Sequence, residues 1–192
     1  MKVFLAGEGR DELGKWFDHP GYRDDKNHPG LIEAFLTNLE IDYMVTDGKR
    51  WRNLLKYEAG DGRSEEMKNV MGAAQEALDL GCDAVVFVRD LDSAPWRETD
   101  IAKGIEKARA EFPDLRICGG VAIQEIEAWI LALKGDHGSE THRDAKEVLK
   151  TKHGVERRNQ KVEVVRAADL TRTPSDAVSL NGWLNEARAL NS

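Results

Sequence analysis

Short apolar runs alternate along the chain with segments whose apolar residues recur at helical spacing. The runs are rich in aliphatic and β-branched residues and end at glycine or at charged residues, which predicts strands at 2–6, 41–45, 84–88 and 115–122. Apolar residues three and four positions apart predict helices at 30–39, 64–80, 99–111 and 125–131. This alternation is typical of an α/β fold, with a Rossmann-like parallel sheet of about four strands and helices on both faces.

The run Ala84-Val85-Val86-Phe87-Val88 is apolar at every position rather than at alternate ones. Both of its faces are therefore expected to be covered, which favours the centre of the sheet. Two segments without a period are predicted to be loops, at 18–29 and at 49–63, and the first of them is rich in Asp, Gly, His and Pro. Ser64 is expected to cap the helix that follows the second loop.

The pattern changes after Leu133. Short helical segments are separated there by glycine-containing stretches at 135–138 and 153–154, and no further run predicts a strand. We therefore expect an α/β domain over 1–134 and a helical C-terminal extension over 135–192 that packs on it. A total of 192 residues is the length of one ordinary domain.

The formal net charge of −7 argues against a protein that coats nucleic acid through bulk positive charge, because such binding needs many Lys and Arg contacts to phosphates. Any nucleic-acid contact must be local. The candidates are Arg10 and a cluster in the second predicted loop, formed by Lys49, Arg50, Arg52 and Trp51, the last predicted to be exposed and able to stack on a base.

Several features bound the compartment and the alternatives. Two distant cysteines, Cys82 and Cys118, indicate no disulfide framework, and neither a signal peptide nor a membrane-length apolar run is recognisable, so a cytoplasmic protein without membrane contact is expected. His137, His142 and His153 lack the spacing of helical metal ligands and are expected on the surface. Trp129 lies on an apolar helical stripe and is expected in the core.

Three predicted strands are followed by acidic residues. The first leads to Glu8 and Glu12, the third to Asp90 and Asp92, and the fourth to Glu125 and Glu127. The carboxyl ends of parallel strands meet at one edge of the sheet, where ligands bind in open α/β folds. Carboxylate oxygens are the ligands that hard cations prefer, so this edge is a candidate site for Mg²⁺ or Mn²⁺.

Spacing predicts how each pair would be oriented. In an extended segment Asp90 and Asp92 point to the same side and could reach one ion together, whereas a helical turn after Asp90 would remove this alignment. Glu8 and Glu12 share a helical face if a helix begins directly after Gly7. Glu125 and Glu127 lie two apart on a helix and diverge, so one of them points inward; we slightly favour Glu127.

The ordered motifs Glu8-Gly9-x-x-Glu12, Asp90-x-Asp92 and Glu125-x-Glu127-Ala-Trp resemble the Toprim-like family of small proteins related to the nuclease half of the overcoming-lysogenization-defect proteins. The resemblance spans roughly the first two thirds of the chain. It implies that Glu8, Asp90 and Asp92 bind Mg²⁺ or Mn²⁺, that Glu12 joins a second metal position, and that DNA is nicked or cleaved in phage defence, often alongside a separately encoded ATPase. The irregular loop at 18–29 departs from the family pattern.

Three functions remain open from the sequence. The first is a metal-dependent phosphodiesterase acting on nucleic acid, with Glu8 or Glu12 helping to move a proton. The second is a metal-binding regulatory or partner subunit of an ATPase system, inactive alone; no Gly-x-x-x-x-Gly-Lys-Ser/Thr motif occurs, so any ATPase is a partner. The third is a domain with an aspartyl phosphoryl acceptor. No motif identifies a catalytic lysine; Lys161, Arg157 and Arg158 are candidates for phosphate contact, although an arginine pair on a solvated helix is the better interpretation.

Overall fold

The computed structural model describes residues 1–16, 28–57 and 64–191, so most of the predicted loop at 18–29 lies outside the described residues. The elements are β1 (Lys2–Gly7), α1 (Arg10–Leu13), η1 (Gly14–Trp16), α2 (Leu31–Asn38), β2 (Met44–Arg50), η3 (Trp51–Asn53), α3 (Glu65–Asp79), β3 (Ala84–Asp90), α4 (Trp96–Glu111), β4 (Arg116–Ala122), α5 (Ile126–Leu133), η4 (Ser139–Thr141), α6 (Ala145–His153), α7 (Arg158–Ala167), α8 (Val178–Arg188) and η5 (Ala189–Asn191).

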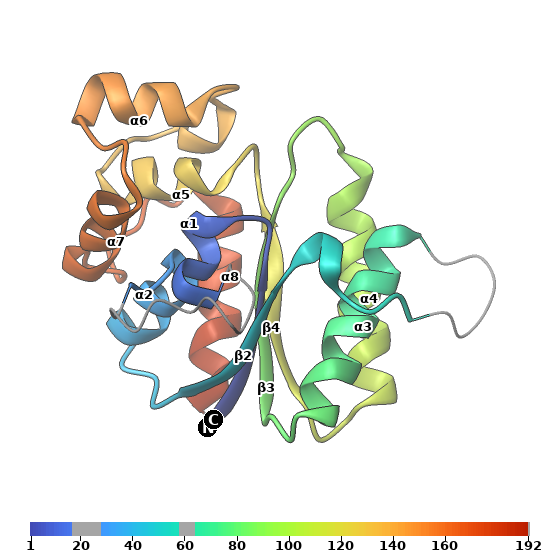
Figure 1. Ribbon diagram of the computed structural model, residues 1–192. Coiled ribbons are helices and arrows are strands. Elements are labelled where there is room, and N and C mark those ends of the chain that lie inside the picture. Colours follow the sequence, from blue (N-terminus) through green and yellow to red (C-terminus); the bar gives the residue numbers. More distant parts are fainter. Residues whose placement is uncertain (17–27, 58–63, 192) are drawn as a thin grey trace.

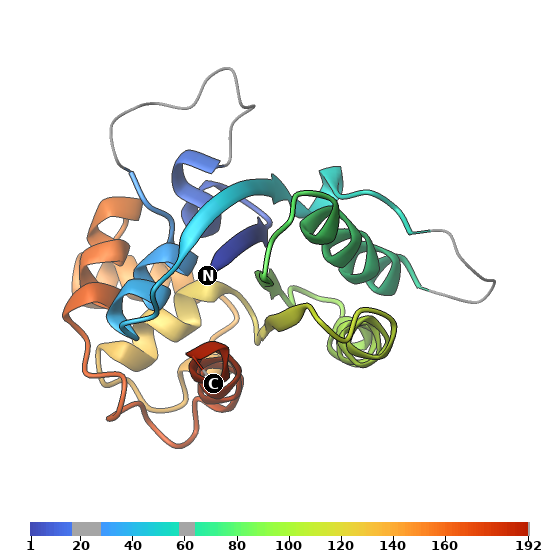
Figure 2. The same ribbon diagram turned by 90° about the horizontal axis from the view of Figure 1, so that it is seen from below.

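The four strands form one parallel sheet in the order β2-β1-β3-β4. Helices α3 and α4 cover one face, and α1, α2, α5 and α8 lie on the other (Figure 1). Viewed along the strands, the sheet separates two helical layers (Figure 2). The predicted α/β class, the parallel sheet and the helices on both faces are therefore confirmed.

Alternate residues of the inner strands serve the two layers. Val3 and Leu5 of β1 are buried in the core shared with α2, α5 and α8, while Phe4 and Ala6 are buried in the core shared with α3 and α4. All five residues of the apolar run at 84–88 are fully buried, which confirms the central position of β3. The sheet therefore has no solvated face along its two inner strands.

The second strand is displaced from its predicted position. The apolar run at 41–45 predicts a strand there, but β2 runs over Met44–Arg50 and takes in the first residues of the predicted loop at 49–63. Its residues pair in parallel with β1, with a register shift between Val3 and Phe4, and the pairing ends with Gly7 opposite Arg50. An edge strand is covered less completely than a central one, so hydrophobicity does not reveal it.

Helix boundaries follow the expected signals more closely. The Ser64 hydroxyl accepts a hydrogen bond from the Met67 backbone N–H at 3.3 Å, which confirms the predicted cap of α3. The fourth helix begins at Trp96, earlier than the predicted Thr99. No helix in the described part of the chain has the length and apolar composition needed to cross a membrane.

The C-terminal helices share the core of the sheet. Glu140 accepts hydrogen bonds from the backbone N–H groups of Ser179 and Leu180, at 3.0 and 3.1 Å, and thereby satisfies the first turn of α8. The Ser179 hydroxyl in turn accepts from Trp129 Nε1 at 2.7 Å. Trp129 is fully buried, as predicted. Residues after 134 thus complete the hydrophobic layer that the earlier part of the chain begins.

Candidate functional site

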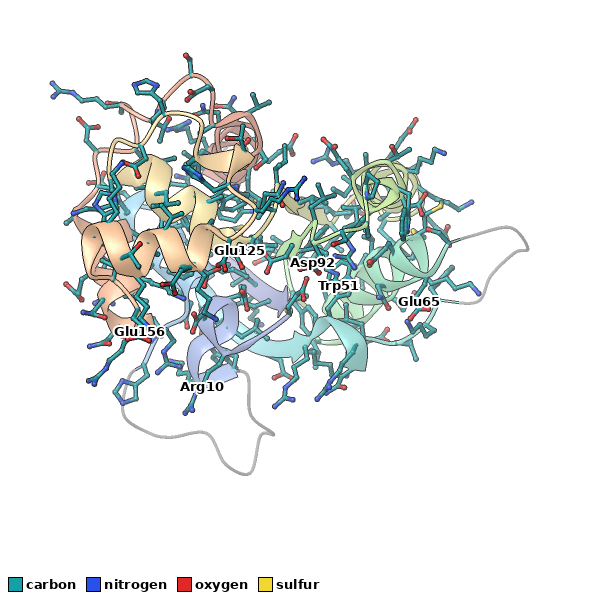
Figure 3. The ribbon with its side chains drawn as sticks, turned by 90° about the horizontal axis from the view of Figure 1, so that it is seen from above. Arg10, Trp51, Glu65, Asp92, Glu125 and Glu156 are labelled. Carbon is teal, nitrogen blue, oxygen red and sulfur yellow. The ribbon has the colours of Figure 1, made fainter. Side chains whose placement is uncertain are left out.

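The carboxyl edge of the sheet has a crevice where the chain changes direction. From β1 the chain proceeds to β2 on one side, and from β3 it proceeds to β4 on the other, so the connections after β1 and β3 diverge. Glu8 follows β1 and Asp90 ends β3, and Glu8 Oε1 accepts the Asp90 backbone N–H at 3.0 Å. Figure 3 looks onto this edge, with Asp92 and Trp51 near its middle. The predicted strand-end position of these acids is therefore observed.

Three carboxyl groups from separate segments gather beside this crevice. Asp90 Oδ1 accepts the Ile126 N–H at 2.9 Å, which aims the side chain at the start of α5. Burial, followed by repulsion from Glu12 and Glu127, raises the pKa of Asp90 to about 8. Glu12 and Glu127 are each 5% exposed. The cluster, defined here as Asp90, Glu12 and Glu127, therefore places the potential negative charge of three carboxyl groups where water is largely excluded, which favours the protonated form of Asp90.

A buried lysine compensates part of this charge. Lys161 of α7 is 1% exposed, and its Nζ lies 2.5 Å from both Glu127 Oε1 and Asp11 Oδ2. Burial alone would lower the pKa of Lys161, but the two carboxylates outweigh it, so the pKa is raised and the amine stays charged. From the sequence, Lys161 is only one candidate for a phosphate contact. The available signal was its place four residues before Val165 on the buried face of α7.

Glu8 is paired with Arg89 rather than left open. Arg89 Nη1 forms an ion pair with Glu8 Oε1, and Arg89 Nε lies 3.4 Å from Glu66 Oε1. Glu66 also accepts hydrogen bonds from Arg97 Nε at 2.7 Å and from Trp51 Nε1 at 2.6 Å. Glu66 therefore contacts two arginines, Arg89 and Arg97, and the indole of Trp51.

Asp92 does not lie beside Asp90 as predicted. The strand ends at Asp90, and Asp92 has a left-handed backbone with φ of 49°. Its side chain is 57% exposed and accepts a hydrogen bond from Arg97 Nη1 at 2.9 Å. The expected same-side alignment required an extended segment and is wrong, because the chain turns immediately after the strand. Asp92 instead lines a hollow of about 470 Å³ with Ser93, Gln124, Glu125 and Arg143.

The relation between Glu8 and Glu12 also differs from the prediction. Helix α1 begins at Arg10 with Gly9 as its N-cap, so Glu8 precedes the helix and the two glutamates share no helical face. Glu12 Oε2 accepts the Gly9 N–H at 2.7 Å and folds back over the start of the helix. Both acids still lie near the end of β1, with Glu8 directly after the strand and Glu12 within α1.

Between the two acids of α5, Glu127 is the one that points into the cluster. Glu125 occupies the N-cap position, and its Oε1 accepts the backbone N–H of Lys146 at 2.6 Å, towards α6. Glu127 lies in the first turn and is paired with Lys161. This orientation agrees with the slight preference for Glu127 from helical spacing.

The predicted nucleic-acid contacts separate into two groups. Trp51 was expected to be exposed, but it is 4% exposed and packs on Phe87 with 5.2 Å between ring centroids, so its ring has no free face for a base. Lys49 is ion-paired with Glu76. Arg10, Arg50 and Arg52 line one hollow together with Glu8 and Arg89.

The donor set fits a hard divalent cation in its chemistry, since every acidic group at this edge offers carboxylate oxygens. Within residues 1–16, 28–57 and 64–191, however, no group of three or more His, Cys, Asp or Glu side chains is arranged to hold a metal ion. Two of these acids already have cationic partners, because Arg89 forms an ion pair with Glu8 and Lys161 forms one with Glu127. A cation would have to replace these partners.

The histidines have separate partners. His153 Nε2 lies 3.1 Å from Asp136 Oδ2 and its side chain is 15% exposed, so its predicted surface position is wrong. His137 is 78% exposed and lies 3.4 Å from Asp176.

No family model, curated protein or solved structure matches this chain. The function must therefore be argued from the residues at the carboxyl edge of the sheet.

Proposed function

We propose that the protein is a Mg²⁺- or Mn²⁺-dependent phosphodiesterase that nicks or cleaves nucleic acid, with DNA as the first substrate to test. The observation that carries the proposal is the position of Asp90. It lies at the carboxyl end of the central strand, at the direction change between β1 and β3, where burial, followed by repulsion from Glu12 and Glu127, raises its pKa to about 8. Such acidic clusters at a crevice suit a site that receives positive charge.

Asp90, Glu8, Glu12 and Glu127 are the residues that would hold the ion. When bound there, a divalent cation polarises a phosphate and lowers the pKa of an attacking water. The resemblance of the Glu8, Asp90 and Glu127 motifs to the Toprim-like proteins supports the same assignment. Asp92, exposed and held by Arg97, is a less favourable ligand in the described conformation.

The chain's own residues supply the remaining requirements. Glu12 is 5% exposed, and burial, the largest influence, raises its pKa, which makes its carboxylate a stronger base for accepting a proton from water. Lys161 pairs with Glu127 and Asp11 and offsets part of their negative charge, which lowers the repulsion of an anionic substrate. Burial around Asp90 excludes water and strengthens each of these interactions.

A plasmid-nicking assay with Mg²⁺ and with Mn²⁺ tests the proposal. Wild type should convert supercoiled to open-circular DNA, and Asp90→Asn should lower the rate by at least about a hundredfold, as expected when a metal-binding group is lost. Asp114→Asn is the matched control, because Asp114 is exposed and precedes β4 at the opposite edge of the sheet. Equal nicking by wild type and Asp90→Asn, or none by either at high protein concentration, rejects the assignment.

A second candidate is a metal-binding partner subunit of a separately encoded ATPase, inactive alone. The observation that favours it is that Glu8 and Glu127 are already occupied by Arg89 and Lys161, a resting arrangement that a partner would have to open. Calorimetry separates the two functions. Mn²⁺ binding that is lost in Asp90→Asn, together with no cleavage by the isolated wild type, supports the partner role.

A further inference from the structure

A hollow of about 440 Å³ lies beside the acidic cluster, between the loop after β1 and the end of β2. Among the described residues, its lining includes four arginines, Arg10, Arg50, Arg52 and Arg89, and one acid, Glu8. The whole chain carries a formal net charge of −7. Positive charge is therefore concentrated in this hollow against the general character of the protein, which is the local arrangement that an anionic ligand requires.

Arg89 is a half-buried arginine of this hollow, and part of its hydrogen-bonding capacity is unused. Its side chain is 13% exposed, and its buried Nε makes no hydrogen bond although Glu66 Oε1 lies 3.4 Å away. A guanidinium group offers five N–H donors in a planar fork that matches phosphate oxygens. Its ion pair with Glu8 uses Nη1, so Glu8 engages only part of the donor set of the guanidinium group.

Neighbouring groups hold Arg89 in this position from behind. Glu66 lies near its Nε and is itself fixed by Trp51 Nε1 and Arg97 Nε. Trp51 lines the hollow but is buried, so its ring offers no surface on which a base could stack. Because Glu66 stays behind the arginine, Glu8 is the partner on the side of the hollow that a ligand would displace.

We propose that this hollow binds a phosphate group of the nucleic-acid substrate, and that Arg89 exchanges Glu8 for that phosphate. The proposal rests on the proposed function for the identity of the substrate, but not for the binding itself. Glu8 Oε1 contacts both Arg89 Nη1 and the Asp90 backbone N–H, so the hollow adjoins the strand end that carries Asp90. Arg52 and Arg10, both exposed at the rim, add charge to the same anion. Release of Glu8 makes its carboxylate available to a cation at the moment the substrate arrives.

Anion binding can be measured without metal. The probe is a labelled single DNA strand of about twelve thymidines, titrated in chelator and followed by fluorescence anisotropy at several salt concentrations. Arg89→Gln and Arg52→Gln should each weaken binding by about tenfold. Each should also lower the slope of log affinity against log salt by about 0.7, the value for one phosphate contact on a single strand. Arg172→Gln, which removes an arginine that is 84% exposed in the C-terminal part, should change neither.

The strand is tested with and without a 5′-phosphate. Tighter binding of the phosphorylated strand assigns the hollow to a terminal phosphate, and equal binding assigns it to an internal one. Wild-type affinity in both Arg89→Gln and Arg52→Gln overturns the proposal. If Arg89→Gln does not fold, the exposed Arg52 decides the question by itself.

A second measurement distinguishes exchange from a merely structural role. Removal of Arg89 frees Glu8, so Arg89→Gln should bind Mn²⁺ severalfold more tightly than wild type in calorimetry without DNA, whereas a damaged site would bind both ligands more weakly. Weaker Mn²⁺ binding by a folded Arg89→Gln overturns the exchange. The two proposals can fail separately. If wild type neither cleaves DNA nor binds Mn²⁺, the proposed function is rejected. If DNA binding still depends on Arg52 in that case, the phosphate site remains supported.

Discussion

Lys161 and Glu127 form an ion pair between α7 and α5, with 2.5 Å from Nζ to Oε1 and only 1% and 7% of the two side chains exposed. Removing one member of such a pair leaves a charge without a partner in a dry environment. We therefore expect Lys161→Met to lower the free energy of unfolding by on the order of 3 kcal/mol. Urea denaturation followed by circular dichroism measures the change.

The double variant Lys161→Met with Glu127→Gln is the control for this pair. It removes both charges of the pair but leaves Asp11, the second partner of Lys161, so it should recover part of the lost stability, since replacing a buried pair costs less than breaking it. A single variant as stable as wild type, or a double variant no better than the single one, contradicts the buried pairing.

The ionisation of Asp90 should be visible in the pH dependence of stability. Its pKa is raised to about 8 in the folded protein, whereas an unfolded chain has an aspartate pKa of about 3.9. Between these values the folded state binds more protons, so the free energy of unfolding falls as pH rises. Asp90→Asn lacks this contribution. In metal-free buffer it should match wild type near about pH 4 and exceed it increasingly up to about pH 9. Parallel melting profiles for the two proteins would rule out the raised pKa.

Asp90 and Asp92 should respond differently to the same substitution. Asp90 is buried among acids, whereas Asp92 is 57% exposed and bound to Arg97. We expect Asp90→Asn to abolish Mn²⁺ binding and the proton release that accompanies it near neutral pH, because binding must displace the proton from Asp90. Asp92→Asn should keep both, with at most a modest loss of affinity. Calorimetry in buffers of different ionisation enthalpy measures the two quantities, and loss of Mn²⁺ binding in Asp92→Asn alone would reverse the assignment.

The close approach of α1 to the start of α2 places Glu12. A Cβ atom on Gly30 would lie 2.0 Å from the Glu12 carbonyl oxygen and 2.6 Å from the Gly14 nitrogen, so even alanine has no room. Gly30→Ala should displace α1, lower stability by about 1–3 kcal/mol and reduce nicking with it. Thermal melting and the nicking assay measure these effects.

Gly182→Ala is the matched control for that substitution. Gly182 lies within α8, and a Cβ there meets nothing within 4 Å. Alanine should stabilise the helix by up to about 1 kcal/mol and leave nicking unchanged. Destabilisation by both substitutions would show that the effect at Gly30 is not due to contact with α1.

Local pattern in the sequence determined the architecture. The apolar run at 84–88 identifies the central strand because burial on both faces removes any alternation, and Ser64 marks the start of α3 through its cap. Strand-end position also brought Glu8 and Asp90 to one edge, since parallel strands necessarily share it. Where the local signal was weak, as in the polar edge strand β2, pairing with β1 decided the boundary.

The composition of the site was decided by tertiary structure. A turn with positive φ at Asp92 separates it from Asp90, and the two-residue spacing contains no trace of that turn. Lys161 and Asp11 are 150 positions apart in the sequence, so no motif of fixed spacing predicts their contact. Trp51 is buried because Phe87 and Glu66 surround it, although its basic sequence neighbours suggested a surface. Strand and helix follow from short-range periodicity, whereas the counter-ions of a buried carboxylate depend on which distant side chains the packed layers bring together.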